Sequence, residues 1–199
     1  MSNSPRISRR NSVGRTFTNN TIREAYPYLL EDFKGRCAYS MQHVQTIGDV
    51  AMNIDHFDPR KKRKKRQAYS NLNLASSQCN ISKSNNWPTR QQRLSGARFL
   101  NPCKEKDYGV HIFEDPTTHE LVGRTVAGNY QILMCNLNAQ HFVLERTERT
   151  ALAKILLEFG KIKSDSATVQ QSISQLRQSY ARKIPPIPPP TTGHGPQAT

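Results

Sequence analysis

The chain has 199 residues, enough for one ordinary domain with tails. Its 29 Lys and Arg exceed its 15 Asp and Glu, and the net charge of +14 predicts attraction to a polyanion, most often nucleic acid. No apolar run approaches the ~20 residues of a membrane-spanning helix, and the N-terminus lacks the apolar segment of a secretory signal. The four scattered cysteines favour a reducing compartment, so we expect a cytoplasmic protein.

Residues 1–75 predict an N-terminal arm, one helix and a pair of strands. Residues 1–20 are polar and basic and predict a flexible arm. Residues 21–35 carry apolar side chains at helical spacing, and Pro27 predicts a kink or a later start. Residues 50–57 predict a strand, and the alternating apolar residues of 71–75 predict a second one.

A run of seven cations separates these two strands. Like charges at this density repel one another and stay solvated, so we expect a loop formed by Arg60, Lys61, Lys62, Arg63, Lys64, Lys65 and Arg66. Ser76 and Ser77 can cap a helix over residues 77–86, which Trp87-Pro88 would end.

The second half predicts two short strands, a third candidate strand, a long helix and a weaker helix, at residues 108–113, 120–126, 128–134, 137–160 and 165–183. Its end, from residue 184, is Pro-rich and predicts an extended, disordered tail. No internal repeat is visible.

The residues that carry chemistry lie at the end of the first strand and just after it. Asp55 precedes His56, and Asn71 and Asn80 follow 15 and 24 residues after the histidine. Asp55 and Asn80 supply oxygen ligands that suit Mg²⁺ or Mn²⁺. A neutral His56 could take a proton from an attacking water, and Asn71 could orient the imidazole through its backbone carbonyl or its side chain. In a basic chain, this set indicates a metal-dependent nuclease with Asp55 and Asn80 as metal ligands.

Simpler explanations exist for each residue. Asp-His dipeptides are common, and the two asparagines could be turn or cap residues. The basic loop, with Lys83, could contact phosphates beside the site, serve as a nuclear-localisation-like patch, or act as a solvated spacer. The prediction depends on the order of the four residues in a strand–loop–strand–helix context.

The chain resembles the HNH (His-Me finger) endonuclease family in GRCAYS, NIDHFDPR and YSNLNLASSQCNISK. FLNPCKEKDYGVHIF and NLNAQHFVLER are similar to small HNH nucleases of retron-associated and Septu-type antiphage systems. The resemblance implies an α+β fold with a ββα-metal finger in a mostly helical single domain with disordered termini. It implies that His56 is the general base, that Asp55 and Asn80 hold the metal, and that Asn71 is the orienting residue, with Asn73 as its competitor.

The resemblance also implies two cysteine pairs that bind structural zinc, but each pair here retains one cysteine, Cys37 and Cys79. Serine is a poor zinc ligand, so we expect no structural Zn²⁺. The two cysteines could instead be buried apolar residues, form a disulfide, or hold zinc with His43. The finger would then depend on packing by Phe33, Tyr39, Phe57, Leu72, Leu74 and Trp87.

The expected organisation is a basic arm (1–20), an endonuclease domain (21–160, finger about 50–87), a helical appendage (161–183) and a Pro-rich tail (184–199). The expected activity is DNA hydrolysis with one Mg²⁺ or Mn²⁺, in antiphage defence or restriction. Control could come from a partner ATPase or a homo-oligomer. The alternatives are a homing or phage-type nicking enzyme, an RNA-cleaving toxin, and a non-catalytic nucleic-acid-binding module.

Overall fold

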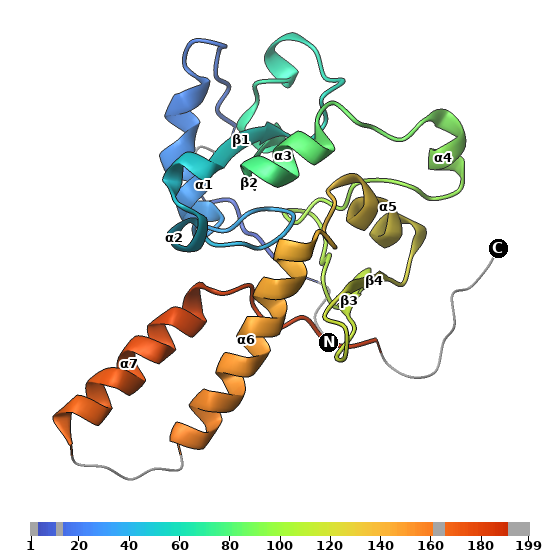
Figure 1. Cartoon of the computed structure of the whole chain (residues 1–199). Helices are drawn as coiled ribbons and strands as arrows, with labels where there is room; N and C mark the ends of the chain where they lie inside the picture. The colour runs from blue at the N-terminus through green and yellow to red at the C-terminus, as the bar shows by residue number, and fades with distance from the viewer. Residues whose placement is uncertain (1–3, 11–13, 161–165, 191–199) are drawn as a thin grey trace.

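A computed structural model describes residues 4–10, 14–160 and 166–190 (Figure 1). The chain combines helices with two separate two-stranded antiparallel sheets, so the expectation of a mixed fold of α-helices and β-strands is confirmed. Among the residues described, no helix is long and apolar enough to cross a membrane.

The first sheet and the helix after it form one compact unit. Strand β1 (Met52–His56) pairs antiparallel with β2 (Leu72–Ser76), and α3 (Ser77–Lys83) follows directly and packs on both strands. The Ser76 side chain accepts a hydrogen bond from the Cys79 backbone N–H, which caps α3 as the sequence predicts. All five residues of β2 are buried, including the polar Asn73 and Ser76 that lie among its apolar residues.

Short helices precede this unit: η1 (Ile22–Ala25), α1 (Tyr26–Asp32), α2 (Val44–Ile47) and η2 (Asp49–Ala51). Pro27 lies in the first turn of α1, where its missing N–H costs nothing, so the α-helix starts later than residue 21. The core includes the buried residues Phe33, Tyr39, Leu72 and Leu74. Phe57 and Trp87 pack edge to face on each other and lie against the same core.

The second sheet pairs β3 (Ile112–Glu114) with β4 (Leu121–Gly123), and α5 (Val126–Met134) follows. The expected strand over residues 128–134 is therefore wrong. Thr125 caps the helix by accepting the Gly128 N–H, and the core contacts of α5 override the strand preference of its aromatic and branched residues.

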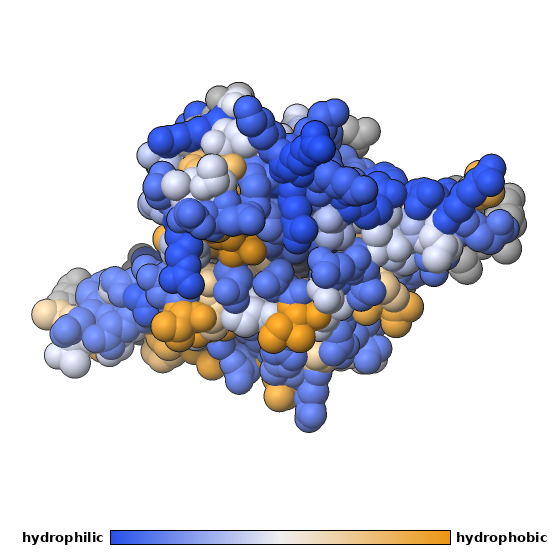
Figure 2. Space-filling model, turned by 90° about the horizontal axis from the view of Figure 1, so that it is seen from above, coloured by the Kyte–Doolittle hydropathy of each residue, from blue (hydrophilic) through white to orange (hydrophobic). Residues whose placement is uncertain are grey.

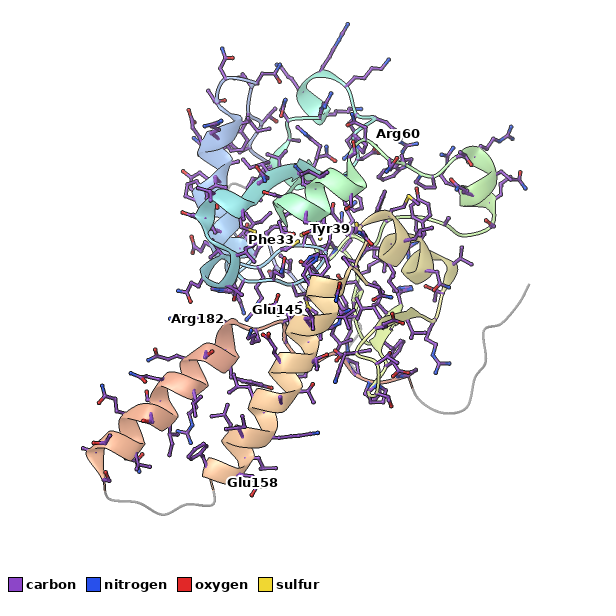
Figure 3. All side chains as sticks on the ribbon, in the orientation of Figure 1. Phe33, Tyr39, Arg60, Glu145, Glu158 and Arg182 are labelled. Atoms are coloured by element: carbon purple, nitrogen blue, oxygen red, sulfur yellow. The ribbon has the colours of Figure 1, made fainter. Side chains whose placement is uncertain are left out.

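Two long helices extend away from the body (Figure 1). They are α6 (Gln140–Phe159) and α7 (Ala167–Arg182), which pack on each other where the sequence predicts helices. Figure 3 shows Glu145 at the end of α6 near the body and Glu158 at its far end. Glu145 accepts hydrogen bonds from the Gln42 side chain and the Ile184 backbone, which hold this end of α6 in place.

Both chain ends contact the body more than their composition suggests. At the C-terminal end, Ile184 and Ile187 are buried and the Glu114 N–H donates to the Pro188 carbonyl. Residues 184–190 therefore do not form the disordered tail expected there, and residues 191–199 lie outside those described.

The N-terminal residues 4–10 and 14–20, called the strap here, run across the body. Arg6 pairs with Asp107, Arg9 donates to the Leu72 carbonyl, and Ile7 and Phe17 are buried. The strap therefore differs from the flexible arm expected over residues 1–20, because the strap's arginines bond to fixed carbonyls and carboxylates of the body.

Three short helices complete the described fold: η3 (Arg63–Lys65) in the basic loop, η4 (Tyr69–Asn71) before β2, and α4 (Arg90–Leu94). Figure 1 shows α4 at the tip of a segment that projects from the body.

Candidate active site

A surface pocket of about 330 Å³ brings together three of the four predicted residues. Asp55 and His56 reach it from the end of β1, and Asn80 reaches it from α3. The lining is completed by Ile54, Pro59, Ile81, Ser84 and Asn85. Larger hollows of about 470 and 450 Å³ lie beside the strap, but neither combines a carboxylate with an imidazole.

Asp55 is buried and already engaged at both carboxylate oxygens. Lys83 donates to Oδ1 at 2.9 Å, and the Tyr39 hydroxyl donates to Oδ2 at 2.5 Å. Each oxygen keeps a second lone pair, so these bonds leave acceptor capacity for a cation. The Lys83 ammonium also donates to the His56 backbone carbonyl and neutralises the buried carboxylate.

Lys83 is therefore not the exposed phosphate contact that the sequence predicts. Its side chain is fully buried at the end of α3, with its ammonium 5.4 Å from the centre of the Phe99 ring. The helical period turns this residue inward, toward the carboxylate that its charge balances.

His56 is oriented by a glutamine that the sequence analysis did not single out. Its Nε2 lies 3.0 Å from Gln67 Oε1, and the Gln67 amide nitrogen donates to Asn19 Oδ1 at 2.5 Å. Because the Gln67 nitrogen is the donor to Asn19, its oxygen faces His56 and the His56 Nε2 must carry the proton. The unprotonated nitrogen is then Nδ1, which is the one able to act as a base.

Asn71 shapes the loop instead of holding the imidazole through its side chain. Its amide nitrogen donates to the carbonyls of Asp58 and Arg66, at the two ends of the basic loop, and its oxygen accepts the Asp58 N–H. Its backbone carbonyl accepts the Phe57 N–H at 2.8 Å, next to His56 in the chain. The sequence predicts that Asn71 orients His56 through its backbone carbonyl or its side chain, but the imidazole meets Gln67 and both groups of Asn71 fix the backbone around the loop.

Asn73, the competitor for that role, is buried opposite Asp55 in the hairpin register. Its oxygen accepts from Arg9 at 2.9 Å and its nitrogen donates to the Tyr39 hydroxyl. Asn73 therefore supports Asp55 through Tyr39 and does not contact the imidazole.

The basic loop stands beside this pocket, because Pro59, which lines the pocket, directly precedes Arg60. Arg60 is paired with Asp58 and lies 4.4 Å above the Trp87 ring, so much of its charge is used inside the protein. Figure 3 shows Arg60 at the outer edge of the body. Lys61 is partly buried, whereas Lys62 to Arg66 are exposed and form no ion pair within the described residues.

The remnants of the two cysteine pairs meet in space. The Tyr39 and Ser40 backbone N–H groups point at Cys37 Sγ, both at 3.4 Å. Burial opposes ionisation of Cys37, but hydrogen bonds from Cys79, Ser40 and Ser76 lower its pKa to about 5, whereas burial raises the pKa of Cys79. Both cysteines are free thiols, and His43 uses its Nδ1 to cap α2.

The residues that the structure describes do not gather the usual metal-ligating side chains in one place. They contain no cluster of three or more His, Cys, Asp or Glu side chains that could hold a metal ion. A cation at the pocket would therefore take ligands from Asp55, the Asn80 amide and water. No protein-family model matches the chain, and no curated protein or solved structure is significantly similar to it.

Proposed function

We propose that the protein is a metal-dependent HNH-type endonuclease that hydrolyses DNA phosphodiester bonds, with the β1–β2–α3 unit as its ββα finger. The observation that carries the proposal is the pocket where Asp55, His56 and Asn80 meet at the surface of a chain with charge +14. The alternative, a non-catalytic nucleic-acid-binding module, gives no reason for an oriented imidazole in that pocket.

The donor set fits a hard divalent cation. The Asp55 carboxylate and the Asn80 amide oxygen are ligand types that Mg²⁺ and Mn²⁺ accept, with water and phosphate oxygens completing the shell. Asn80 lines the pocket, and its side chain has no hydrogen-bond partner among the described residues. Bound there, the cation would supply Lewis-acid stabilisation to the scissile phosphate and the leaving 3′ oxygen.

His56 supplies the base in this proposal. Nε2–H is held by Gln67, so Nδ1 accepts a proton from the water that attacks the phosphate. Gln67 acts as a positioning residue, because it keeps one tautomer and one ring orientation available to the water. The resulting imidazolium is compatible with the glutamine oxygen, which accepts from Nε2–H in both protonation states.

The biological role proposed here is antiphage defence or restriction, and it rests on the family resemblance alone. Control by a partner ATPase is part of the same proposal. It is tested by asking whether the protein copurifies with an ATPase and whether that partner changes cleavage.

Plasmid cleavage tests the chemistry. The purified protein should cut supercoiled DNA with Mg²⁺ or Mn²⁺ and not with a chelator. His56→Ala should lose at least about 100-fold in rate, as expected for a general base, and should retain DNA binding. Cleavage by the variant at the parent rate would exclude His56 as the base. Absence of cleavage by the parent, alone and with its partner, would exclude the activity.

A further inference from the structure

The positive charge of the chain is concentrated in one segment. Residues 59–104 contain none of the 15 acidic residues but hold 12 of the 29 Lys and Arg. The remaining residues carry 17 cations against 15 acids, so they are close to neutral. The segment includes the basic loop, β2, α3 and α4. It contributes to the strongly hydrophilic face that Figure 2 shows from above.

Part of this segment projects from the body as an arm, defined as residues 84–96 with α4 at its tip (Figure 1). Every residue of α4 is exposed, including Leu94 at 74%. The helix is held by its own capping box, in which Thr89 and Gln92 exchange side-chain and backbone hydrogen bonds. The helix therefore has no apolar face against the core, and its side chains are open to solvent.

Two arginines are available on this helix. Arg90 forms no ion pair within the described residues, and Arg93 is exposed while one of its nitrogens donates to the Pro88 carbonyl. That bond restricts the Arg93 side chain before any partner arrives. By contrast, the nearby Arg98 is neutralised by a two-point pair with Glu105.

The arm and the basic loop both begin at the rim of the pocket that holds Asp55 and His56. Pro59, which directly precedes the basic loop, lines this pocket together with Ser84 and Asn85, the first residues of the arm. A polyanion lying over the pocket would therefore have cations from both segments beside it.

The exposed chemistry of this segment favours a duplex over a single strand. Single-strand binders present aromatic rings on which bases stack. Here Tyr69 and Phe99 are buried and Trp87 is covered by Arg60, and no aromatic side chain of the described residues is classed as exposed. Cations without stacking surfaces contact the phosphate backbone and leave the base pairs intact.

We infer that the α4 arm is a second phosphate-contact element, which binds the backbone of duplex DNA through Arg90 and Arg93 beside the pocket. The basic loop, which also begins at the rim of the pocket, contacts the same duplex. This inference deepens the proposed function, on which it rests for the identity of the substrate, and it adds a binding surface outside the catalytic residues.

Equilibrium binding tests the arm. In the His56→Ala background, with Mg²⁺ present, the fluorescence anisotropy of a short labelled DNA duplex is measured over a range of salt concentrations. Arg90→Gln/Arg93→Gln should weaken binding and lower the slope of log K against log salt by about 2, roughly 1 per lost phosphate contact. The matched control is Lys154→Gln/Arg177→Gln, which removes the same charge from exposed positions on α6 and α7.

The control pair should keep the parent slope. An equal loss in the control would mean that net charge alone matters, and parental binding by the arm variant would exclude the arm as a contact. Arm-dependent binding that is tighter to single strands or to duplex RNA would overturn the assignment of duplex DNA. Arm-dependent duplex binding without plasmid cleavage by the parent would refute the nuclease and leave the arm's role intact.

Discussion

Asp55 and Lys83 form a buried ion pair whose disruption should destabilise the fold. Removing one partner leaves an uncompensated buried charge, so Lys83→Met should lower the free energy of unfolding by about 3–5 kcal/mol in metal-free buffer. If Asp55 is a metal ligand, Mn²⁺ should stabilise the variant more than the parent, because the repelling ammonium is gone. Denaturant unfolding with and without Mn²⁺ measures both. Equal Mn²⁺ effects in the two proteins would argue against Asp55 as a ligand.

The contact between Gln67 and His56 makes a prediction about pH. In Gln67→Glu, a carboxylate would face Nε2–H and stabilise the imidazolium, whereas the base must be neutral. The acid limb of the pH–rate profile should therefore move to higher pH, with little change at the alkaline end.

The control for this variant is Gln78→Glu, which adds the same charge at an exposed position of α3. An unchanged profile in Gln67→Glu, or an equal shift in the control, would contradict the positioning role. NMR assignment of the protonated nitrogen of His56 gives a test that needs no cleavage.

The strap is the element whose contribution to stability is least expected from composition. Arg9 donates to the Leu72 carbonyl and to Asn73, and its guanidinium lies over the rings of Phe33 and Tyr69. Arg9→Gln should lower the free energy of unfolding by about 1–3 kcal/mol, since it leaves buried acceptors unpaired. Arg10→Gln changes an exposed side chain and should stay within about 0.5 kcal/mol of the parent. Similar losses in both would show that Arg9 has no specific role.

The lowered pKa of Cys37, which lies beside Cys79, predicts a second pH effect. With the pKa of Cys37 lowered to about 5, its thiolate stabilises the fold fully above the ordinary thiol pKa, and this contribution is lost as the pH falls through about 5. The stability difference between the parent and Cys37→Ser should therefore shrink as the medium is acidified. A difference independent of pH would mean that Cys37 is a neutral thiol.

One bound equivalent of zinc by metal analysis would overturn the prediction of a finger without zinc.

Local sequence signals predicted the elements that form the site but not the side chains that support it. β1, β2 and α3 follow from apolar runs and from the Ser76 cap, which act over a few residues. The Gln67–Asn19 bond joins residues 48 apart, and the bond from Lys83 to Asp55 joins residues 28 apart on α3 and β1. Such contacts are set by tertiary packing and leave no periodic trace in the sequence.

The distribution of charge over the whole molecule predicts how it binds. Replacing Lys61 to Arg66 by Ser or Gln, while keeping Arg60 for its contacts with Asp58 and Trp87, should weaken DNA binding at every sequence alike. The salt dependence should also flatten, because fewer counterions are released. Binding to several unrelated duplexes measures this. A loss confined to one sequence would contradict backbone contact.

The central claim, that His56 is the base of a nuclease, is tested most directly by chemical rescue. His56→Gly removes the imidazole and leaves space beside Asp55 and Asn80, where a free base can enter from solvent. If His56 is the base, this variant should cut plasmid DNA at a negligible rate, and added imidazole should restore metal-dependent cleavage. Cleavage by His56→Gly at the parent rate without imidazole would contradict it, as would failure of imidazole to restore any cleavage in a variant that still binds DNA.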